Sequence, residues 1–327
     1  KDVCVKEQNL QSFEVINPLP VPFDEGIADV PAFTANAGAT AYGAFLDAFL
    51  PDIVHVHTLM GLHKSFLQAT KNRKIRLVFT AHDFFPICPK VTMFRHGAIC
   101  SNVKNYEACG VCNATALDLK KIHILQSPIY RCLKDLSVVK KLRKKHRDDY
   151  LSEATVDDSV IPVGSVEDYR KLRNYYYSLL KLMDMIHYNS SVTRSVYESV
   201  FDLPQHCLVA ITHADINDNR RIKEFSDGRL HIRYLGPQSG SKGYFLLKKA
   251  LDQLWEKEKE FCLDVHFRPI EMAPYIEVHP RYAYGELETI FEQTDILVTP
   301  SIWFETFGFT VLEALSYGVP VVISGTV

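Results

Sequence analysis

The strongest constraint on the fold is the order in which strand-like and helix-like segments follow one another. "DIVHVHTL" (52–59) and "IRLVFTAHD" (75–83) are short apolar runs, and the helix-like "LHKSFLQATK" (62–71) lies between them. After the polar stretch "NDNRRIKEFSDG", the alternation starts again at "LHIRYLG" (230–236) and continues to the last strand-like run, "VPVVIS". Alternating strands and helices predict parallel sheets with helices on both faces. We therefore predict an α/β fold of two doubly wound, Rossmann-like domains that face each other.

The polar stretch near residues 213–228 marks the predicted boundary between these domains. Residues 1–213 would form the N-terminal domain, including a Cys-rich loop at 84–113, and residues 214–327 the C-terminal domain, truncated at its end. In open parallel sheets, ligands bind beyond the carboxyl ends of the strands. That rule directs attention to the loops that follow Val56, Thr80, Leu235 and Pro300.

Composition narrows the classes of protein that this chain can belong to. The 327 residues suit two domains, and a 47% hydrophobic content allows each a sizeable core. A net charge of -2 gives no reason to expect nucleic acid as a partner. No run approaches the roughly 18 apolar residues of a membrane span, and no secretory signal opens the chain. We therefore expect a cytoplasmic protein.

Two glutamates, Glu305 and Glu313, stand out in the apolar stretch "SIWFETFGFTVLEALSYGVPVV". If a helix begins near Phe309, both carboxylates lie beside the exposed N–H groups of its first turn. That end of a helix binds phosphate readily, and Gly308 lets a ligand approach the backbone. Carboxylates accept hydrogen bonds from sugar hydroxyls. The alternative is that Glu313 is an ordinary helix residue and that Glu305 only stabilises the helix start by its charge.

The surrounding residues resemble a known enzyme family. "DILVTPSIWFETFGFTVLEALSYGVPVV" is similar to the nucleotide-binding segment of family 4 glycosyltransferases in their E-x7-E form, which are retaining enzymes of the GT-B fold. The segments "RYLGPQSGSKGYFLLKKAL", "DIVHVHTLMGL", "VFTAHDFFPICP" and "GELETIFEQTD" resemble other parts of the family in the same order. The likeness runs from about residue 40 to the end of the chain.

This resemblance implies a set of donor-binding residues. Glu305 would contact hydroxyls of the donor sugar, and Glu313 the ribose of the nucleotide. Lys242 would neutralise the diphosphate. Many members carry an arginine early in the phosphate loop, where this chain has Pro237, so that small residues would supply donors instead. The remaining residues that the resemblance assigns to donor binding are Ser239, Gly240, Arg281, Tyr282, Phe307, Gly308, Phe309 and Thr310.

Two histidines are the candidates nearest the reaction centre. His57, in "HVHTLMG", matches a family position near the donor sugar, and His82, in "AHDF", follows the next strand. Both should face the gap between the domains, because the carboxyl ends of parallel strands share one edge of a sheet. A histidine at a strand end is also often structural. The predicted catalytic set is therefore His57, His82, Lys242 and Glu305.

The resemblance also implies a reaction. A sugar would pass from a nucleotide diphosphate sugar to a glycan or lipid-linked acceptor, with retention of anomeric configuration, in the synthesis of a cell-surface polysaccharide. The leaving diphosphate would be stabilised electrostatically, and the family usually needs no metal for this step. A nucleotide-sugar epimerase or hydrolase and a non-catalytic sugar-nucleotide binder are the alternatives on the same fold.

Two further features concern the N-terminal domain. Cys88, Cys100, Cys109 and Cys112 suit a structural zinc site, although free thiols or disulfides formed on oxidation are the alternatives. The basic stretch "KDLSVVKKLRKKHRDDY" (134–150) is either a solvated helix face or a contact with an anionic membrane surface. The second interpretation would make this a peripheral protein of the inner membrane face.

Overall fold

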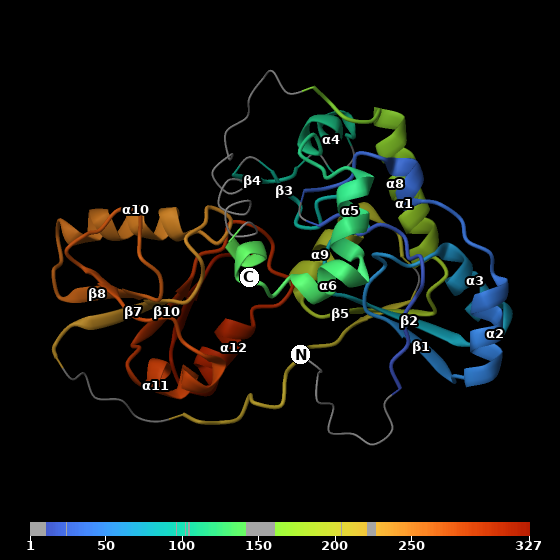
Figure 1. Cartoon of the computed structure of the whole chain (residues 1–327). Helices are drawn as coiled ribbons and strands as arrows, with labels where there is room; N and C mark the ends of the chain where they lie inside the picture. Colours follow the sequence, from blue (N-terminus) through green and yellow to red (C-terminus); the bar gives the residue numbers. More distant parts are fainter. Residues whose placement is uncertain are drawn as a thin grey trace.

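The strands of the chain form two main parallel sheets that lie on opposite sides of the molecule (Figure 1). The computed structural model describes residues 11–23, 25–95, 97–101, 103, 105–141, 161–203, 205–220 and 227–327. Within them, the first sheet takes its strands from residues 53–208 and the second from residues 230–323.

The N-terminal sheet has the order β1-β2-β5-β6, and all three neighbouring pairs are parallel. Its strands are β1 (Ile53–Val56), β2 (Arg76–Ala81), β5 (Met185–Tyr188) and β6 (His206–Leu208). The helices of this part are α1 (Val30–Phe33), α2 (Thr40–Phe49), α3 (Lys64–Asn72), α8 (Val166–Leu180) and α9 (Ser191–Val200). One continuous hydrophobic core joins α1, α3, α8 and α9 to the sheet, and Tyr42 of α2 packs against Phe66 of α3.

The longest described helix, α8, explains much of this core. It begins at a capping box, in which Ser165 and Asp168 satisfy each other's backbone N–H groups. Tyr169, Leu172 and Tyr176 then recur at helical spacing, and each is at most 4% exposed. The Tyr169 hydroxyl donates to the carbonyl of Ile27 over 2.9 Å, so the helix also holds the N-terminal segment in place.

The C-terminal sheet has the order β11-β10-β7-β8-β9, also parallel throughout. Its strands are β7 (Leu230–Tyr234), β8 (Phe261–Val265), β9 (Ile276–Val278), β10 (Ile296–Thr299) and β11 (Val321–Ile323). Figure 1 shows α10 (Tyr244–Trp255) over one face, and α11 (Leu287–Glu292) and α12 (Phe309–Ser316) over the other. A short 3-10 helix, η1 (Tyr284–Glu286), leads into α11.

The strand order places a ligand site. The chain runs outward from β7 through β8 to β9, then returns to β10 on the other side of β7 and runs outward to β11. The strands β7 and β10 therefore flank the point at which the order reverses, and ligands of open α/β sheets bind there, beyond the carboxyl ends. The loops that leave these two strands are the ones that contain Lys242 and Glu305.

These two sheets confirm the predicted α/β class with two parallel sheets. The predicted boundary at residues 213–214 falls between β6, which ends at Leu208, and β7, which begins at Leu230. Residues 221–226 of the polar stretch lie outside the described residues. The division into domains 1–213 and 214–327 stays a prediction.

The Cys-rich loop is ordered by packing into the N-terminal core. It holds a small antiparallel pair, β3 (Phe94–Arg95) with β4 (Ala98–Ile99), followed by α4 (Glu107–Cys112). Four of its apolar side chains are at most 3% exposed and join the core: Phe84, Phe85, Ile87 and Met93. Buried aromatic and aliphatic side chains of this size are sufficient to hold a loop in place.

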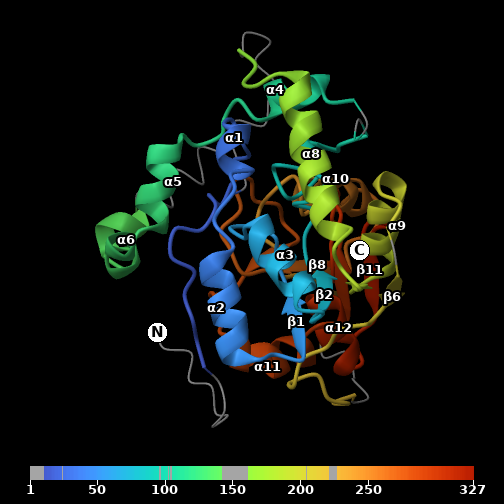
Figure 2. The same ribbon diagram turned by 90° about the vertical axis from the view of Figure 1, so that its right-hand side faces the viewer.

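Two short helices, α5 (Leu119–Gln126) and α6 (Pro128–Leu133), follow the Cys-rich loop. Figure 2 shows them at one side of the molecule, away from β1 and β2. Their exposed side chains include Ile124, Ile129 and Leu133. The helices within the described ranges include none whose length and apolar character would let it span a lipid bilayer.

We predict that Asn113→Ala destabilises the N-terminal part by roughly 1–3 kcal/mol, the usual cost of a buried polar group left without its partner. The Asn113 side chain is 1% exposed, accepts from the Ile27 N–H over 2.9 Å and donates to the Cys109 carbonyl over 2.9 Å. Chemical denaturation of the purified variant measures the change in unfolding free energy. Asn36→Ala, at an exposed position, is the matched control, and equal stability of the two variants would contradict the role given to Asn113.

Candidate functional site

The loop after β7 forms a tight turn that presents Lys242. Ser239 is 7% exposed, and its hydroxyl accepts from the Lys242 N–H over 3.3 Å. The Gly243 N–H donates to the Gly240 carbonyl over 2.9 Å, which closes the turn before α10 begins. Small residues are needed here because the loop folds back on itself within a few residues.

Gly243 brings this loop against the loop that follows β10. Its φ of +76° lies in the left-handed region that favours glycine, and a Cβ there would lie 1.8 Å from the Pro300 carbonyl oxygen. The Ser241 carbonyl accepts from the Ile302 N–H over 2.8 Å. The two loops at the switch point are therefore joined through their backbones.

Glu305 completes the connection between the loops with its side chain. Its Oε1 accepts from Lys242 Nζ over 2.7 Å, from the Ser301 hydroxyl over 2.6 Å and from Trp303 Nε1 over 2.9 Å. Lys242 Nζ also lies 4.6 Å from the centroid of the Trp303 ring. The sequence patterns single out Lys242 and Glu305 separately, and the structure brings them into contact.

The surroundings of Glu305 keep it ionised. Burial alone would raise the pKa of this carboxyl. The hydrogen bonds from Lys242 and Ser301, together with the charge of Lys242, outweigh burial, so that the pKa of Glu305 lies below its ordinary value. The side chains of Lys242 and Glu305 are 29% and 15% exposed. A negative and a positive group are thus held side by side, both within reach of a ligand from outside.

The start of α12 lies where the sequence predicts it. The helix begins at Phe309 with Gly308 as its N-cap, and among the described residues no side chain caps it. An uncapped helix start attracts phosphate through its N–H groups and its dipole. Of the predicted donor residues, Phe307 and Gly308 lie in the turn before the helix, and Phe309 and Thr310 in its first turn.

Glu313, one turn into α12, faces residues from two other segments. Its Oε1 lies 3.4 Å from His213 Nε2, and its side chain is 12% exposed. The His213 ring packs against the rings of Phe309 and Tyr284, with centroids 5.3 Å and 5.9 Å away. His213 and Tyr284 were not among the predicted site residues. The sequence does contain a signal for His213. This histidine, in "THAD", directly follows the strand-like run "CLVAI", just as the predicted site residue His82 directly follows a strand.

Arg281 and Tyr282, the weaker candidates for contact with a base, lie in the segment before η1. Arg281 is exposed, whereas Tyr282 is half-buried with its ring centroid 4.7 Å from that of His266. Burial raises the pKa of the Tyr282 hydroxyl, and the charge of Glu313 raises it further.

His57 and His82 meet at the carboxyl edge of the N-terminal sheet. His57 Nδ1 lies 2.9 Å from His82 Nε2, and both side chains are exposed. His55 and His187 extend the group: the His55 ring centroid lies 4.1 Å from that of His57 and 5.7 Å from that of His187. The sequence "HVH" could have predicted the place of His55. Residues two apart on a strand share a face, so His55 and His57 should lie side by side.

Partial burial and the neighbouring imidazoles favour the neutral forms of His55 and His82. Burial lowers the pKa of His55, and the neighbouring histidines lower it further. Burial and the neighbouring His57 lower the pKa of His82 in the same way. At neutral pH these rings therefore offer a hydrogen-bond donor and an acceptor rather than a positive charge.

The loop of Glu305 lies against the N-terminal part of the chain. The ring of Phe304 packs on that of Phe84 with centroids 6.0 Å apart, and the Thr193 hydroxyl donates to the Thr306 carbonyl over 3.2 Å. Since Phe84 is two residues after His82, this contact places the histidine edge of one sheet beside the glutamate loop of the other.

The structure does not support the predicted zinc site at the four clustered cysteines. Among the described residues, no three of Cys88, Cys100, Cys109 and Cys112 have sulfur atoms that all lie within 4.8 Å of one another. Each is a free thiol, and burial raises the pKa of Cys88 to about 12 and of Cys109 to about 11. The prediction rested on four cysteines that lie close together in the sequence. Phe84, Phe85, Ile87 and Met93 anchor their loop in the core.

Comparison with known proteins identifies the C-terminal segment. Residues 271–326, which run from the approach to β9 through Glu305 and Glu313, match the family model described as "Glycosyl transferases group 1". The resemblance drawn from the E-x7-E segment is thereby confirmed. No curated protein is similar enough to this chain to count as a match.

Several solved structures are similar to this chain at low sequence identity. Sucrose-phosphate synthase from Thermosynechococcus elongatus is 13% identical, with 91% of this chain and 60% of that chain covered at a TM-score of 0.45. Anabaena Alr3699/HepE in complex with UDP-glucose is 12% identical, and the match covers 88% of this chain and 63% of that chain at a TM-score of 0.45. The GtfA/B complex is 14% identical, and the match covers 88% of this chain and 46% of that chain at a TM-score of 0.48. The chain thus spans less than two thirds of each, and likenesses this low add nothing to the topology described above.

We predict that Gly243→Ala separates the two loops and lowers stability by at least about 1–3 kcal/mol, the cost of holding a non-glycine residue in a strained backbone conformation. The added Cβ would also collide with the Pro300 carbonyl. Gly240→Ala in the same turn is the control, because its Cβ would meet nothing within 4 Å. Thermal melting of both variants decides, and a Gly243→Ala protein as stable as Gly240→Ala would show that the loops do not depend on this contact.

Proposed function

The chain belongs to the group 1 glycosyltransferases, the family that its residues 271–326 match, and we propose that it transfers a sugar from a nucleotide diphosphate sugar to a glycan or lipid-linked acceptor. The transfer retains the anomeric configuration, and its product serves the synthesis of a cell-surface polysaccharide. The observation that carries the proposal is the contact of Lys242 with Glu305, 2.7 Å apart, between the two loops of the switch point.

In this proposal, the diphosphate of the donor binds between Lys242 and the start of α12. Lys242 supplies a charge, and the N–H groups of the helix start supply directed hydrogen bonds. As the bond between sugar and phosphate breaks, negative charge grows on the departing diphosphate. Groups that are already in place stabilise that charge without reorganising, which makes electrostatic stabilisation the main catalytic effect.

The two glutamates hold the ends of the donor. Glu305 accepts hydrogen bonds from sugar hydroxyls, since its ionised carboxylate is acceptor-only and already oriented by Ser301 and Trp303. Glu313 accepts from the ribose hydroxyls, with His213 and Tyr284 forming the wall beside it. Ser239 and Gly240 shape the phosphate loop, and Arg281 and Tyr282 lie on the side of the base.

The acceptor enters from the histidine edge of the N-terminal sheet. Its hydroxyl attacks the anomeric carbon from the face that the phosphate leaves, and a phosphate oxygen takes the proton, so that no protein nucleophile is needed. His57 and His82 orient the sugar and the acceptor through hydrogen bonds, and the lowered pKa of His82 favours the neutral form of that ring.

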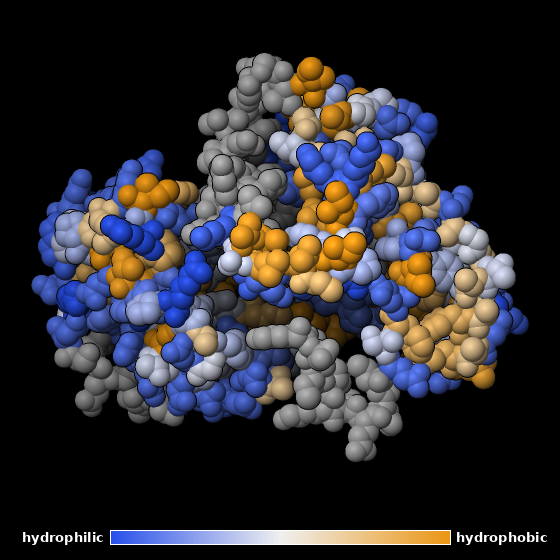
Figure 3. All heavy atoms as spheres, viewed as in Figure 1, coloured by the Kyte–Doolittle hydropathy of each residue, from blue (hydrophilic) through white to orange (hydrophobic). Residues whose placement is uncertain are grey.

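Exposed apolar side chains favour a lipid-linked acceptor and a peripheral position on the cytoplasmic face of a membrane. Figure 3 shows hydrophobic side chains gathered over α5 and α6 and the residues after them. Ile129, Leu133, Leu136 and Val138 are between 44% and 72% exposed there. Lys134, Lys140 and Lys141 stand among them, and lysines of this kind are attracted to anionic lipids. Residues 142–150 of the basic stretch lie outside the described residues.

A panel of nucleotide diphosphate sugars tests the activity. Release of nucleoside diphosphate is followed for each donor, with and without a mixture of lipid-linked and free glycan acceptors. Release that depends on an acceptor supports transfer. Release without acceptor would indicate a hydrolase, a rearranged donor an epimerase, and donor binding without turnover a non-catalytic binder.

We predict that Lys242→Met weakens the binding of the nucleoside diphosphate by roughly tenfold to a hundredfold. A charge-assisted hydrogen bond typically contributes about 1.5–3 kcal/mol, and each 1.4 kcal/mol or so is a factor of ten in affinity. The fold should survive, because Glu305 keeps the hydrogen bonds from Ser301 and Trp303. Calorimetric titration measures the affinity, and thermal melting verifies the fold.

Lys249→Met is the matched control for this variant, since Lys249 is exposed on α10 of the same domain. It changes the net charge equally and should bind the nucleoside diphosphate as the wild type does. Equal affinities of Lys242→Met and Lys249→Met would remove Lys242 from the donor site.

A further inference from the structure

A row of polar side chains lies on the face of the C-terminal sheet opposite α10. Ile232 on β7, Leu263 on β8 and Ile276 on β9 pack with Leu247 and Leu251 of α10 in one hydrophobic cluster. Successive strand residues point to opposite faces, so the neighbours of these residues point away from α10. The register pairs His231 with Cys262, Arg233 with Asp264, and Asp264 with Glu277.

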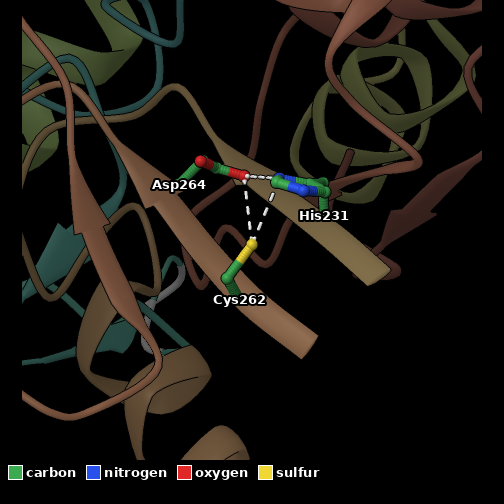
Figure 4. A group of neighbouring side chains, drawn as sticks. All are labelled: His231, Cys262 and Asp264. Carbon is green, nitrogen blue, oxygen red and sulfur yellow. Dashed lines mark hydrogen bonds and ion pairs between the residues drawn. The ribbon is translucent and has the colours of Figure 1, made fainter. Parts of the chain in front are cut away.

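Three of these side chains converge on one point, as Figure 4 shows. His231 Nδ1 lies 3.2 Å from Cys262 Sγ and 3.1 Å from Asp264 Oδ2, and Cys262 Sγ lies 3.8 Å from Asp264 Oδ2. Ligand bonds of about 2.0–2.3 Å in a tetrahedron place neighbouring donor atoms about 3.3–3.6 Å apart. Each of the three observed separations between donor atoms lies close to that range.

We propose that His231, Cys262 and Asp264 form a zinc site, in which Nδ1, Sγ and Oδ2 are the protein ligands and water is the fourth. The set of one nitrogen, one sulfur and one oxygen suits Zn²⁺, which accepts all three donor types. A thiolate ligand excludes the hard cations Mg²⁺ and Ca²⁺, which prefer oxygen. Cys262 and Asp264 are 0% and 1% exposed, so the ligands are fixed by the sheet rather than mobile.

A second layer of contacts orients the ligands as metal sites require. His231 Nε2 lies 3.3 Å from Asp227 Oδ2, and donation of its proton there leaves Nδ1 free to bind the metal. His279 Nε2 lies 2.5 Å from Asp264 Oδ1, which fixes the carboxylate and leaves Oδ2 for the ion. Asp227 and His279 are not themselves ligands. Each contacts the ligand atom that points away from the proposed ion, which is Nε2 of His231 for Asp227 and Oδ1 of Asp264 for His279.

The neighbouring group of Asp264, Glu277 and His279 fits a metal less well. The 2.5 Å between His279 Nε2 and Asp264 Oδ1 is a hydrogen-bond length, too short for two ligands of one ion. Glu277 is already paired with Arg229 over 2.8 Å. We therefore assign the ion to the group that contains Cys262.

A purely hydrogen-bonded network is the competing explanation. Arg233 is 1% exposed and its Nη1 lies 3.8 Å from Asp264 Oδ1, so a cation already faces this carboxylate. A thiol is a weak hydrogen-bond donor, however, and gains little from a place between an imidazole and a carboxylate. Zinc would replace the thiol proton, which leaves for solvent, and join Cys262 to both neighbours.

The position of the group indicates a structural role. His231 and Cys262 are the second residues of β7 and β8, whereas the donor loop leaves the opposite, carboxyl end of β7. The ion would tie two adjacent strands together at the end of the sheet away from the donor. Binding of nucleoside diphosphate should therefore not depend on it.

Cobalt substitution tests the site on the full chain. The reduced protein is freed of metal with a chelator and titrated with Co²⁺, whose bond to a thiolate gives a charge-transfer absorption in the near ultraviolet. We expect one equivalent to produce this absorption in the wild type and in Cys132→Ser, which removes an exposed thiol elsewhere. Cys262→Ser should abolish it. An absorption that persists in Cys262→Ser and disappears in Cys109→Ser would place the metal in the Cys-rich loop and overturn the proposal.

Zinc alone provides the second measurement. Zn²⁺ should raise the melting temperature of the wild type and of Cys132→Ser but not of Cys262→Ser. If Cys262→Ser does not fold, His231→Gln decides, because its partly exposed ring can be replaced with little loss of packing. We expect at least about tenfold weaker Zn²⁺ binding, the smallest loss usual when a metal site is disturbed. Wild-type protein that binds no Zn²⁺, or His231→Gln that binds it equally well, would contradict the site.

Discussion

The ion pair between Lys242 and Glu305 is the interaction on which the candidate site depends. It joins the loops after β7 and β10, where the strand order of the C-terminal sheet reverses. Opposite charges that are partly shielded from water attract each other more strongly than they would in bulk solvent, yet each retains unsatisfied hydrogen-bonding capacity. A ligand with a phosphate and hydroxyl groups matches both halves of the pair. The fold thus keeps two complementary charges at fixed positions, and preorganisation of this kind would lower the cost of binding and of charge development in the proposed transfer.

The N-terminal sheet completes this arrangement from the other side. Its histidines gather at the carboxyl edge, and Phe84, shortly after His82, packs against Phe304, next to Glu305. Apolar and backbone contacts, rather than ion pairs, connect the two parts at this point, as the Thr193–Thr306 hydrogen bond also shows. Such contacts can shift without leaving a charge unpaired, which would suit a closure of the two parts around the proposed donor that excludes water. The proposed acceptor side and donor side are therefore brought together by the same loop that carries Glu305.

Sequence reasoning succeeded where the chain follows local rules and failed where the contacts are distant. The start of α12 at Phe309 and the strands β7, β8 and β10 were predictable, because buried parallel strands are short apolar runs and Gly308 precedes the helix. The helix α8 was missed although Ser165 and Asp168 form a capping box, since no strand alternation draws attention to it. The zinc prediction for the Cys-rich loop is not supported, and the burial of Phe84 and Phe85, which holds that loop in place, depends on residues far along the chain. For the same reason, His231, Cys262 and Asp264 show no ligand spacing that would mark them in the sequence.

A double-mutant cycle between Lys242→Met and Glu305→Gln, measured as donor affinity by calorimetry, tests the central claim most directly. If the two side chains bind different parts of one donor from a shared, preorganised pair, each variant should weaken binding. The loss in the double variant should then differ from the sum of the single losses by about 0.5 kcal/mol or more, as is usual for residues in contact. Single variants that bind every nucleotide sugar as tightly as the wild type would contradict the account, because the pair would then only hold two loops together.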